Sequence, residues 1–540
     1  MSNTVSYSAH IDTFAADNLP PPELQPQFIF ELPELQFPER LNCASELLDK
    51  HVAEGRGDRL CIQAEGLRWT YADLQDKANR IANVLTQNLG LVSGNRVLLC
   101  APNNPMMVAA WFGVIKAGGI AVAAMPLLRA KELGTIVDIA QISHALCDEA
   151  LRAEVQGAQQ KSATLKAVRF FNSGASDGLE ALMAQASGDF TAVDTASTDT
   201  CLLGFTSGTT GVPKATMHFH RDVMAVCACW PQSMLRANAD DVFIGSPPMA
   251  FTFGLGGQVL FPMAIGASMA LLEKASPPLL LDGIEKFGAT VVFTAPTSYR
   301  VMAQQGERVR ASKLRKCVSA GEALTASTRA LWKDATGIEI IDGIGSTEML
   351  HIFISHHEDD ARPGATGKAV PGYRAKVVDD DGKEVPVGTV GKLAVQGPTG
   401  CRYLNDERQT KYVSRGWNLT GDAYLMDADG YFVYQARTDD MIISAGYNIA
   451  APEVEEALMA HAAVAECAVI GVADSERGQI VKAFVVLRAG HAADDAMVKT
   501  LQDFVKSTVA PYKYPRAVQF VDQLPRTATG KLQRFRLHAQ

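Results

Sequence analysis

A run of small and hydroxyl-bearing residues that ends in a lysine is the segment of this 540-residue sequence best suited to chemistry. It follows the apolar stretch 201–205 and reads Thr206-Ser207-Gly208-Thr209-Thr210-Gly211-Val212-Pro213-Lys214. Its glycines allow close backbone approach, its hydroxyls and amides are hydrogen-bond donors, and its lysine adds positive charge. Because the stretch before it is typical of a buried strand, we predict a loop at a strand end that binds polyphosphate.

This loop differs from the Walker A motif of P-loop NTPases. Lys214 is followed by Ala215, where that motif needs Ser or Thr to bind magnesium, and the glycines are closer together. A flexible Ser/Thr/Gly linker would explain neither the apolar stretch before the loop nor its Pro-Lys end. The sequence therefore disfavours both a P-loop NTPase fold and a plain linker.

The loop resembles the phosphate loop of the adenylate-forming superfamily, which includes acyl-CoA synthetases, luciferases and the adenylation domains of peptide synthetases. Further segments that resemble this family's motifs follow in the family's order, from Trp69-Thr70-Tyr71 to Lys531. An ordered set over nearly the whole chain is far more specific than any single motif. The resemblance implies ATP and Mg²⁺ at the site, with coenzyme A as cosubstrate.

Two segments after the phosphate loop resemble the family's metal and ribose motifs. In the motif that matches 342–348, the threonine contacts the α-phosphate and the glutamate holds Mg²⁺, which implies these roles for Thr347 and Glu348. A hard cation prefers carboxylate oxygen and offsets charge on the leaving pyrophosphate. In 417–422 the resemblance implies that Asp422 accepts hydrogen bonds from both ribose hydroxyls. The other nucleotide-binding residues implied are Ser207, Gly208, Thr209, Thr210, Gly211, Lys214, Ser319, Ala320, Gly321, Glu322, Asp342, Gly343 and Arg437.

A lysine near the carboxyl terminus completes the implied adenylation site. Lys531 ends the segment 524–531, which resembles the family loop that delivers a lysine to the reacting groups. The acid carboxylate and the ATP phosphate repel each other, so a cation that touches both stabilises the charge that develops between them. The catalytic residues are therefore predicted to be Lys531, Thr206 and Glu348.

The segment 436–440 resembles the family's hinge. The resemblance implies that Asp439 is the pivot about which a small domain turns between two half-reactions, adenylate formation and thioester formation. Two residues depart from the family's pattern, because Ala436 replaces the usual glycine and Ile443 stands where lysine is frequent. These departures affect details of the hinge and of a coenzyme A tunnel that is implied near Ala445, Gly446 and Tyr447.

The acid pocket is predicted from two segments, 248–256 and 343–353. Peptide-synthetase domains place an aspartate in the first segment to pair the substrate ammonium, because an unpaired buried charge is costly. This chain has no acidic residue there, so an α-amino acid is disfavoured. The second segment closely resembles benzoate-CoA ligases, in which the residue matching His351 lies beside the substrate ring and carboxylate. The predicted pocket residues are Phe251, Thr252, Phe253, Tyr299, Ile344, Gly345 and His351.

The amino-terminal run 10–21 looks like that of 2-aminobenzoate-CoA ligases, and the Thr252 hydroxyl is suited to an ortho amino group. The leading hypothesis is therefore an aromatic carboxylic acid, 2-aminobenzoate, as the small-molecule partner. Benzoate, other substituted benzoates and medium-chain fatty acids stay open, since a small group changes pocket discrimination by only about 1–3 kcal/mol. An aryl-acid-AMP ligase that loads a carrier protein is also open, although no carrier domain is evident. An inactive nucleotide-binding protein is opposed by the intact phosphate loop, Glu348 and Lys531.

The elements that must position these residues alternate between strand and helix. Apolar runs predict strands at 96–100, 289–294 and 314–319, and helical periodicity predicts a helix over 106–116. Such alternation indicates a parallel α/β body. Beyond residue 388 the pattern changes to strands separated by turns, at 391–395 and 430–434, and then to a mixed segment with a helix at 451–461 and strands at 467–472 and 482–487.

We therefore predict an α/β fold with three parts. The proline-rich residues 1–40 would form an extended arm rather than a helix. Residues 41–438 would form a large domain of parallel α/β subdomains plus a β subdomain, which binds ATP and the acid. Residues 439–540 would form a small, mobile α+β lid.

Composition restricts partners and location. The net charge of −9 disfavours nucleic acid and anionic lipid as partners. The ten cysteines show no metal-ligand spacing, and the amino terminus lacks a secretory pattern, so we expect a cytoplasmic protein. The uncharged stretch 251–272 contains glycines and a proline without a basic flank, so it is a better candidate for buried core than for a membrane span. A monomer or a homodimer is expected from base rates.

Overall fold

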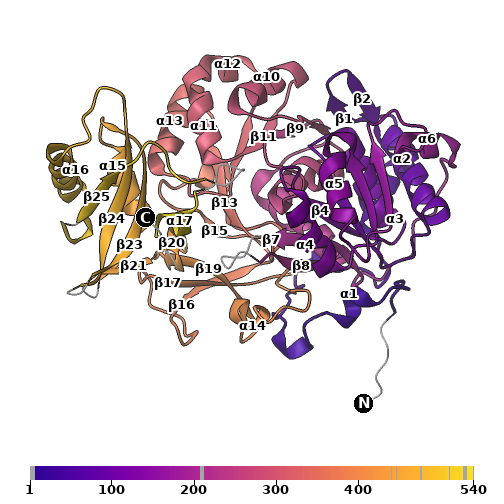
Figure 1. Ribbon diagram of the computed structural model, residues 1–540, viewed down its shortest axis with the longest axis horizontal. Coiled ribbons are helices and arrows are strands. Elements are labelled where there is room, and N and C mark those ends of the chain that lie inside the picture. The colour runs from indigo at the N-terminus through magenta and orange to yellow at the C-terminus, as the bar shows by residue number, and fades with distance from the viewer. Residues whose placement is uncertain are drawn as a thin grey trace. The chain divides into compact units, whose positions relative to one another are not determined.

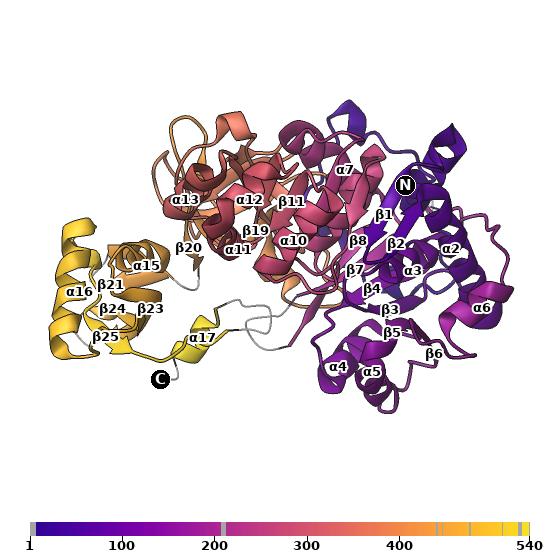
Figure 2. The same cartoon turned by 90° about the horizontal axis from the view of Figure 1, so that it is seen from above.

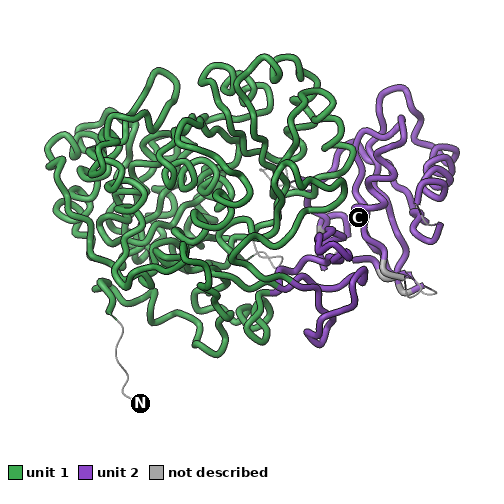
Figure 3. Tube along the Cα trace, turned by 180° about the vertical axis from the view of Figure 1, so that it is seen from behind, with its two compact units in different colours: residues 1–375, 395–418 green, residues 376–394, 419–540 purple. Residues whose placement is uncertain are grey.

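The computed structural model describes residues 7–206, 212–438, 441–444, 447–474, 477–509, 511–526 and 532–538. These residues form two compact units, which are coloured separately in Figure 3. Unit 1 contains residues 1–375 and 395–418, and unit 2 contains residues 376–394 and 419–540. The boundaries predicted at 40 and 438 stay predictions.

A six-stranded sheet in unit 1 carries the phosphate loop. Its order is β6-β5-β3-β4-β7-β8, and all neighbours are parallel except the antiparallel pair β7 and β8. Helices cover both faces, with α2 and α3 on one side and α4 and α5 on the other (Figure 2). The bounds are β3 Arg96–Cys100, β4 Ile120–Ala124, β5 His144–Asp148, β6 Ala167–Phe171, β7 Thr200–Thr206, β8 Lys214–Phe219, α2 Tyr71–Asn83, α3 Pro105–Lys116, α4 Ala130–Ala140 and α5 Arg152–Gln159.

Local signals explain the start and the end of helix α3. The Asn104 side chain accepts a hydrogen bond from the Met107 amide, and Pro105 occupies the first turn, where its missing N–H costs nothing. The chain leaves the helix at Gly118, whose φ of 72° favours glycine. The strand predicted at 96–100 and the helix predicted over 106–116 are confirmed.

A nine-stranded sheet forms the other half of the α/β body in unit 1 (Figure 1). The strands from β10 through β9, β11 and β12 to β13 are parallel, which confirms the predicted α/β class. Strands β11 and β12 lie within the runs predicted at 289–294 and 314–319. The order is β15 Lys368–Ala369, β14 Ile352–Ser355, β13 Ile340–Gly345, β12 Lys316–Ser319, β11 Val291–Thr294, β9 Val242–Gly245, β10 Ser268–Ala270, β1 Leu60–Ala64 and β2 Leu67–Thr70.

The uncharged stretch 251–272 folds as short helical pieces and a strand. It contains α8 Thr252–Leu255, the π-helical turn Gly256–Leu260, α9 Phe261–Ile265 and β10. Residues 254–263 are all buried, which confirms the expectation of core. Among the described residues, no helix is both long enough and apolar enough to cross a membrane.

The strand-rich segment that was predicted after residue 388 is confirmed as a five-stranded sheet. Its order is β16-β17-β19-β18, with β20 paired to β19. The bounds are β16 Arg374–Val378, β17 Gly391–Gln396, β18 Val413–Ser414, β19 Trp417–Met426 and β20 Phe432–Arg437.

The last hundred residues of unit 2 form a sheet with helices against it, as predicted for an α+β segment. Strand order is β22-β21-β24-β23 with β25 on β24, and an apolar core includes Val454, Val469 and Leu501. The bounds are β21 Met441–Ser444, β22 Tyr447–Ala450, β23 Val464–Asp474, β24 Gly478–Leu487, β25 Ala517–Phe520, α15 Ala451–Met459, α16 Asp495–Thr508 and α17 Arg534–Leu537.

The described part of the amino-terminal arm is mostly extended but contains a short α-helix, α1 Phe14–Asp17, and two 3₁₀ turns, Pro22–Leu24 and Pro33–Leu35. The expectation of an arm without a helix is wrong at this point, because Asp12 accepts a hydrogen bond from the Phe14 amide and starts a turn. Further along, the arm packs on the body, where the Ile29 amide donates to the Gly397 carbonyl over 3.0 Å.

Candidate active site

The two strands that carry the phosphate loop place Thr206 opposite Lys214. These residues are paired at the end of the β7–β8 hairpin. The Thr206 hydroxyl is buried and makes no hydrogen bond to any described residue. The connecting residues Ser207, Gly208, Thr209, Thr210 and Gly211 lie outside the described residues.

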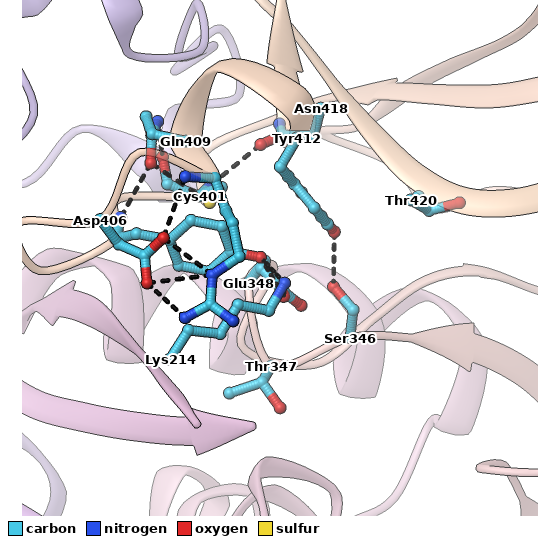
Figure 4. A network of polar contacts seen from close by, with 12 residues as sticks. Lys214, Ser346, Thr347, Glu348, Cys401, Asp406, Gln409, Tyr412, Asn418 and Thr420 are labelled. Atoms are coloured by element: carbon cyan, nitrogen blue, oxygen red, sulfur yellow. Dashed lines mark hydrogen bonds and ion pairs between the residues drawn. The ribbon is translucent and has the colours of Figure 1, made fainter. Parts of the chain in front are cut away.

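Lys214 and Glu348 form an ion pair between the phosphate-loop hairpin and the turn after β13. Lys214 Nζ lies 3.1 Å from Oε1 of Glu348, and Figure 4 shows the two side chains together. Thr347, the residue before the glutamate, packs so tightly on β7 that a Cβ on Gly204 would lie 2.6 Å from its methyl group. The structure thus brings together three residues that the sequence assigned to nucleotide and metal binding.

A tyrosine that the motifs did not predict joins this pair. The Tyr403 hydroxyl donates to Oε1 of Glu348 over 2.5 Å, and Lys214 donates to the Tyr403 oxygen. Beside it, the Tyr412 hydroxyl is 3.1 Å from Oγ of Ser346, a contact drawn in Figure 4. Both tyrosines belong to the segment 399–412, which lies against the turn that carries Glu348.

The residues around Glu348 suit a divalent cation. Burial by itself raises the pKa of Glu348, but Lys214 and the Tyr403 hydroxyl together outweigh it, so the pKa lies below its usual value. An ionised carboxylate is a hard oxygen donor of the kind that Mg²⁺ prefers. Glu348 therefore fits the metal role that the family resemblance implies.

Three predicted nucleotide residues lie at the carboxyl ends of parallel strands. Ser319 ends β12 and is paired with Asp342 of β13, while Gly343 follows Asp342. Burial raises the pKa of Asp342 to about 7, although Arg329 acts in the opposite direction. This edge of a parallel sheet is where α/β folds bind ligands. The segment continues through Ala320, Gly321 and Glu322, and the φ of Gly321 is 87°.

In unit 2, Asp422 and Arg437 are opposite each other on neighbouring strands. They are paired between β19 and β20, and Arg437 Nη1 donates to Oδ1 of Asp422 over 2.9 Å. The same nitrogen is 3.2 Å from the Thr420 carbonyl oxygen. The structure thus joins the two residues that the sequence assigned to the ribose.

His351 lies in a closed set of aromatic rings at the start of β14. Ring centroids of Phe261, Phe253 and Trp230 are 4.5, 5.8 and 5.8 Å from the imidazole centroid. Phe293 packs on all three of these rings. Neither imidazole nitrogen makes a hydrogen bond of normal geometry to a described residue. Burial lowers the pKa of His351 to about 3, although the nearby Phe253 carbonyl acts in the opposite direction.

The other predicted pocket residues have mixed positions. Phe251 is 36% exposed and precedes Thr252 and Phe253 on α8. A Cβ on Gly345 would lie 2.7 Å from the His351 carbonyl oxygen, so its neighbour Ile344 and this glycine run beside the histidine.

Tyr299 lies in a core cluster rather than in the aromatic set around His351. Its hydroxyl donates to the Val318 carbonyl over 2.8 Å, and its ring packs edge-on against Trp332. Its side chain is fully buried by residues of α11 (Pro296–Met302), α13 (Ala326–Thr336) and the sheet. These contacts account for Tyr299 by packing alone, and its role as a pocket wall stays a prediction.

Several predicted residues lie outside the described parts of the chain. They are the adenylation lysine Lys531, the hinge residue Asp439 and the tunnel residues Ala445 and Gly446. Tyr447, the third tunnel residue, is the first residue of β22.

Sequence reasoning missed the segment 399–412. Arg402 and Asp222 form a fully buried ion pair with a distance of 2.7 Å, and Arg408 Nη1 donates to the Val212 carbonyl over 3.0 Å, at the end of the phosphate loop. The charged residues of 399–412 were a usable signal, because such residues are seldom buried without partners. The sequence could not indicate that the partners lie near residues 212, 222 and 348.

The spacing of the cysteines in the sequence also did not predict a buried cluster of two cysteines and a histidine. The side-chain donor atoms of Cys43, Cys201 and His220 all lie within 4.8 Å of one another. His220 Nδ1 already accepts a hydrogen bond from the Cys43 amide over 3.1 Å, so this nitrogen is not available to a metal ion. Cys227 and Cys229 are both buried.

Comparison with known proteins identifies the family. Residues 49–403 match the AMP-binding enzyme family, and residues 453–531 match its AMP-binding enzyme C-terminal domain. The chain therefore belongs to the AMP-binding enzyme family, which confirms the resemblance to adenylate-forming enzymes and makes it an acid–thiol ligase.

Its relatives include aryl acid–CoA ligases. The chain is 36% identical to benzoate–CoA ligase of Thauera aromatica over 522 residues, which cover 94% of this chain and 97% of the relative. The crystal structure of the anthranilate CoA ligase AuaEII in complex with anthranoyl-AMP is 32% identical, with a TM-score of 0.87 and coverage of 94% and 98%. ATP-bound MatB from Rhodopseudomonas palustris is 30% identical, with a TM-score of 0.84 and coverage of 92% and 98%.

Proposed function

We propose that this enzyme activates an aryl carboxylic acid with ATP, first as an acyl-AMP and then as acyl-CoA with release of AMP and pyrophosphate, and that its leading substrate is 2-aminobenzoate. The observation that carries the aryl preference is the set of aromatic rings around His351. Such a set of rings would favour a flat aromatic substrate, because aromatic pairs are most stable at centroid distances of about 4.5–7 Å.

The charges of the residues around His351 support a substrate whose ring is uncharged. His351 stays uncharged because its pKa is about 3, so its nitrogens are a donor and an acceptor without net charge. The predicted pocket segment 248–256 has no acidic residue, so a substrate ammonium would find no counter-charge there. The amino group of 2-aminobenzoate is an aniline, which is uncharged at neutral pH and needs only a hydrogen-bond partner.

The first half-reaction would take place between the acid slot and the phosphate-loop hairpin. The acid carboxylate attacks the α-phosphorus of ATP in line, the bond to the pyrophosphate oxygen breaks, and acyl-AMP and pyrophosphate result. Lys214, Thr206 and Thr347 would bind phosphate oxygens, and Lys531 would stabilise charge between carboxylate and phosphate. Glu348 would hold Mg²⁺, which when bound supplies positive charge to the departing pyrophosphate.

The second half-reaction would use unit 2. Asp422 and Arg437 would bind the ribose, and Asp439 would serve as the pivot between half-reactions. The thiolate of coenzyme A, entering near Ala445, Gly446 and Tyr447, attacks the acyl carbon, and AMP leaves with the electron pair of the broken C–O bond.

Two features support 2-aminobenzoate over benzoate within this proposal. The AuaEII relative was solved with anthranoyl-AMP, and its fold and length match this chain closely. Thr252 lies next to Phe253 of the aromatic set, and its hydroxyl is suited to accept from an ortho amino group.

The test is acyl-CoA and AMP formation from purified protein with ATP, Mg²⁺ and coenzyme A, with 2-aminobenzoate, benzoate and octanoate in parallel. Turnover of the two aromatic acids that is lost in Lys531→Ala supports the aryl ligase, and their kcat/KM ratio decides the ortho amino question. Octanoate turnover alone would replace the proposal by a medium-chain fatty acid ligase. Adenylate without thioester would indicate a carrier-protein acceptor.

A further inference from the structure

Lys214, Tyr403 and Glu348 come from distant parts of unit 1 and form a continuous line of polar contacts. Lys214 donates to the Tyr403 oxygen, and the Tyr403 hydroxyl donates to Oε1 of Glu348. Lys214 Nζ is also 3.1 Å from the same oxygen. The lysine thus pairs with the glutamate directly and also contacts the side chain that orients it.

The donors and acceptors available set the direction of these hydrogen bonds. Tyr403 is 1% exposed. An ammonium can only donate and an ionised carboxylate can only accept, so the Tyr403 hydroxyl donates a hydrogen bond to Glu348 while its oxygen accepts one from Lys214. One donor and one acceptor on a rigid ring fit the space between an ammonium and a carboxylate.

The Tyr403 ring is itself held in one place. The backbone amide of Tyr403 donates to Oε1 of Gln409 over 2.8 Å, and the side-chain amide of Gln409 donates to the Leu24 carbonyl over 2.9 Å. The Tyr412 ring packs edge-on against it at 5.8 Å between centroids. The amino-terminal arm and the segment 399–412 thus fix the hydroxyl that contacts Glu348.

A buried carboxylate without a counter-charge is costly, and Glu348 is only 6% exposed. Lys214 supplies this charge before any ligand binds. The proposed function brings a triphosphate and a divalent cation to the same carboxylate. Because the cation would compensate Glu348 as well as the lysine does, and the phosphates attract the lysine, the two positive charges can exchange places.

We propose that Tyr403 is a positioning residue, which holds Lys214 on Glu348 as a resident counter-ion that a divalent cation replaces when ATP binds. After the exchange, the lysine is free to contact the phosphates at the end of the loop from which it extends. This inference rests on the proposed role of Glu348 as metal ligand. It adds that ATP without a divalent cation binds weakly, since the lysine can reach the phosphates only by leaving Glu348 uncompensated.

The test is ATP binding to the full-length protein by isothermal titration calorimetry, once in EDTA and once with excess Mg²⁺. For the wild type, Mg²⁺ should tighten ATP binding by at least about tenfold. Glu348→Gln removes the charge but keeps the shape, so metal-free ATP should bind about tenfold more tightly than to the wild type, and Mg²⁺ should add little. Tyr403→Phe removes only the hydroxyl and should tighten metal-free binding by about three- to tenfold.

Tyr71→Phe is the matched control. Tyr71 is fully buried, and its hydroxyl donates to the Ala267 carbonyl over 2.7 Å, so this variant loses a buried hydrogen bond of similar kind. It should show the wild-type response to Mg²⁺. Suppose that Mg²⁺ tightens ATP binding to Tyr403→Phe as strongly as to Tyr71→Phe, but does not tighten binding to Glu348→Gln. The positioning role of Tyr403 is then refuted, and the metal role of Glu348 stands. If Mg²⁺ tightens ATP binding to Glu348→Gln as strongly as to the wild type, the metal role itself fails.

Discussion

Glu348 and His351 are both buried and only three residues apart in the sequence, yet their surroundings differ in kind. Glu348 contacts an ammonium and a phenolic hydroxyl, whereas His351 is surrounded by aromatic rings. Between them, Leu350 has a φ of 67°, a left-handed conformation that is uncommon for residues other than glycine and that turns the chain sharply. One short turn thus connects a charged region to an apolar one.

On the proposed function, the two regions would have different roles. The region around Glu348 depends on the placement of charges, so changes there should alter the rate of a reaction that moves charge between phosphates. The region around His351 depends on volume and ring packing, so changes there should alter which acid binds and how tightly. Substitutions in one region should leave the kinetic parameter of the other nearly unchanged.

The largest effect is expected at the charged region. Glu348→Gln should lower kcat for pyrophosphate release by about 10²- to 10³-fold, because charge stabilisation in the transition state is lost. The KM for benzoate should stay within about twofold of the wild-type value, since the acid slot is unchanged. If the KM for benzoate rose in parallel with the KM for ATP, the two regions would not have separate roles.

Gly256→Ala tests the aromatic region. An added Cβ would lie 2.3 Å from the His351 ring, so the imidazole must shift. Overpacking of this size costs about 1–3 kcal/mol, which corresponds to a rise of about 5- to 150-fold in the KM for the aryl acid. The KM for ATP should not change.

Gly134→Ala is the control for this substitution. Gly134 lies in α4, and an added Cβ there would meet no atom within 4 Å. Its kinetic parameters should equal those of the wild type. An equal rise in the KM for ATP in Gly256→Ala would show that the two regions are not independent.

The pH dependence of stability gives a third comparison. The pKa of His351 is about 3 in the folded protein and near 6.5 in the unfolded chain. Between these values the unfolded chain binds the additional proton, so His351 lowers the free energy of unfolding as pH falls below 6.5, by about 1.4 kcal/mol per pH unit. As pH falls from 7.5 to 5.5, the free energy of unfolding of His351→Leu should therefore rise by about 1.4 kcal/mol relative to that of the wild type, as measured by urea denaturation. A constant difference between the two proteins over this range would show that His351 is not held neutral.

The smallest effect is expected at Tyr299, which lies outside the aromatic set around His351. If Tyr299 acts only in the core, Tyr299→Phe should lower the free energy of unfolding by about 1 kcal/mol, because one buried hydrogen bond to the Val318 carbonyl is lost. The KM for the acid should not change. If the KM for the acid rises fivefold or more, Tyr299 acts as a wall of the pocket.

Features that depend on neighbours in the sequence were predictable from the sequence alone. Buried runs predicted β3, β11 and β12, and the apolar periodicity of the segment predicted α3. The motifs singled out Lys214 and Glu348 for the predicted phosphate and metal roles, because such roles leave recognisable local patterns.

The partners of these residues were decided by the tertiary structure. Tyr403 lies 55 positions from Glu348, in a segment between strands, and no local pattern indicates that its hydroxyl reaches the carboxylate. The core contacts of Tyr299, which was predicted as a pocket wall, also depend on the order of neighbouring strands and not on a local pattern.

The physical reason is that side-chain periodicity, capping and turn formation act over a few residues, whereas contacts across a sheet depend on strand order and on the path of the connecting loops. The sequence by itself determined the fold class and the family, and it predicted the groups that would bind ATP. Only the tertiary structure decided that the charge on Glu348 is balanced by Lys214 through Tyr403, and that His351 is uncharged among aromatic rings.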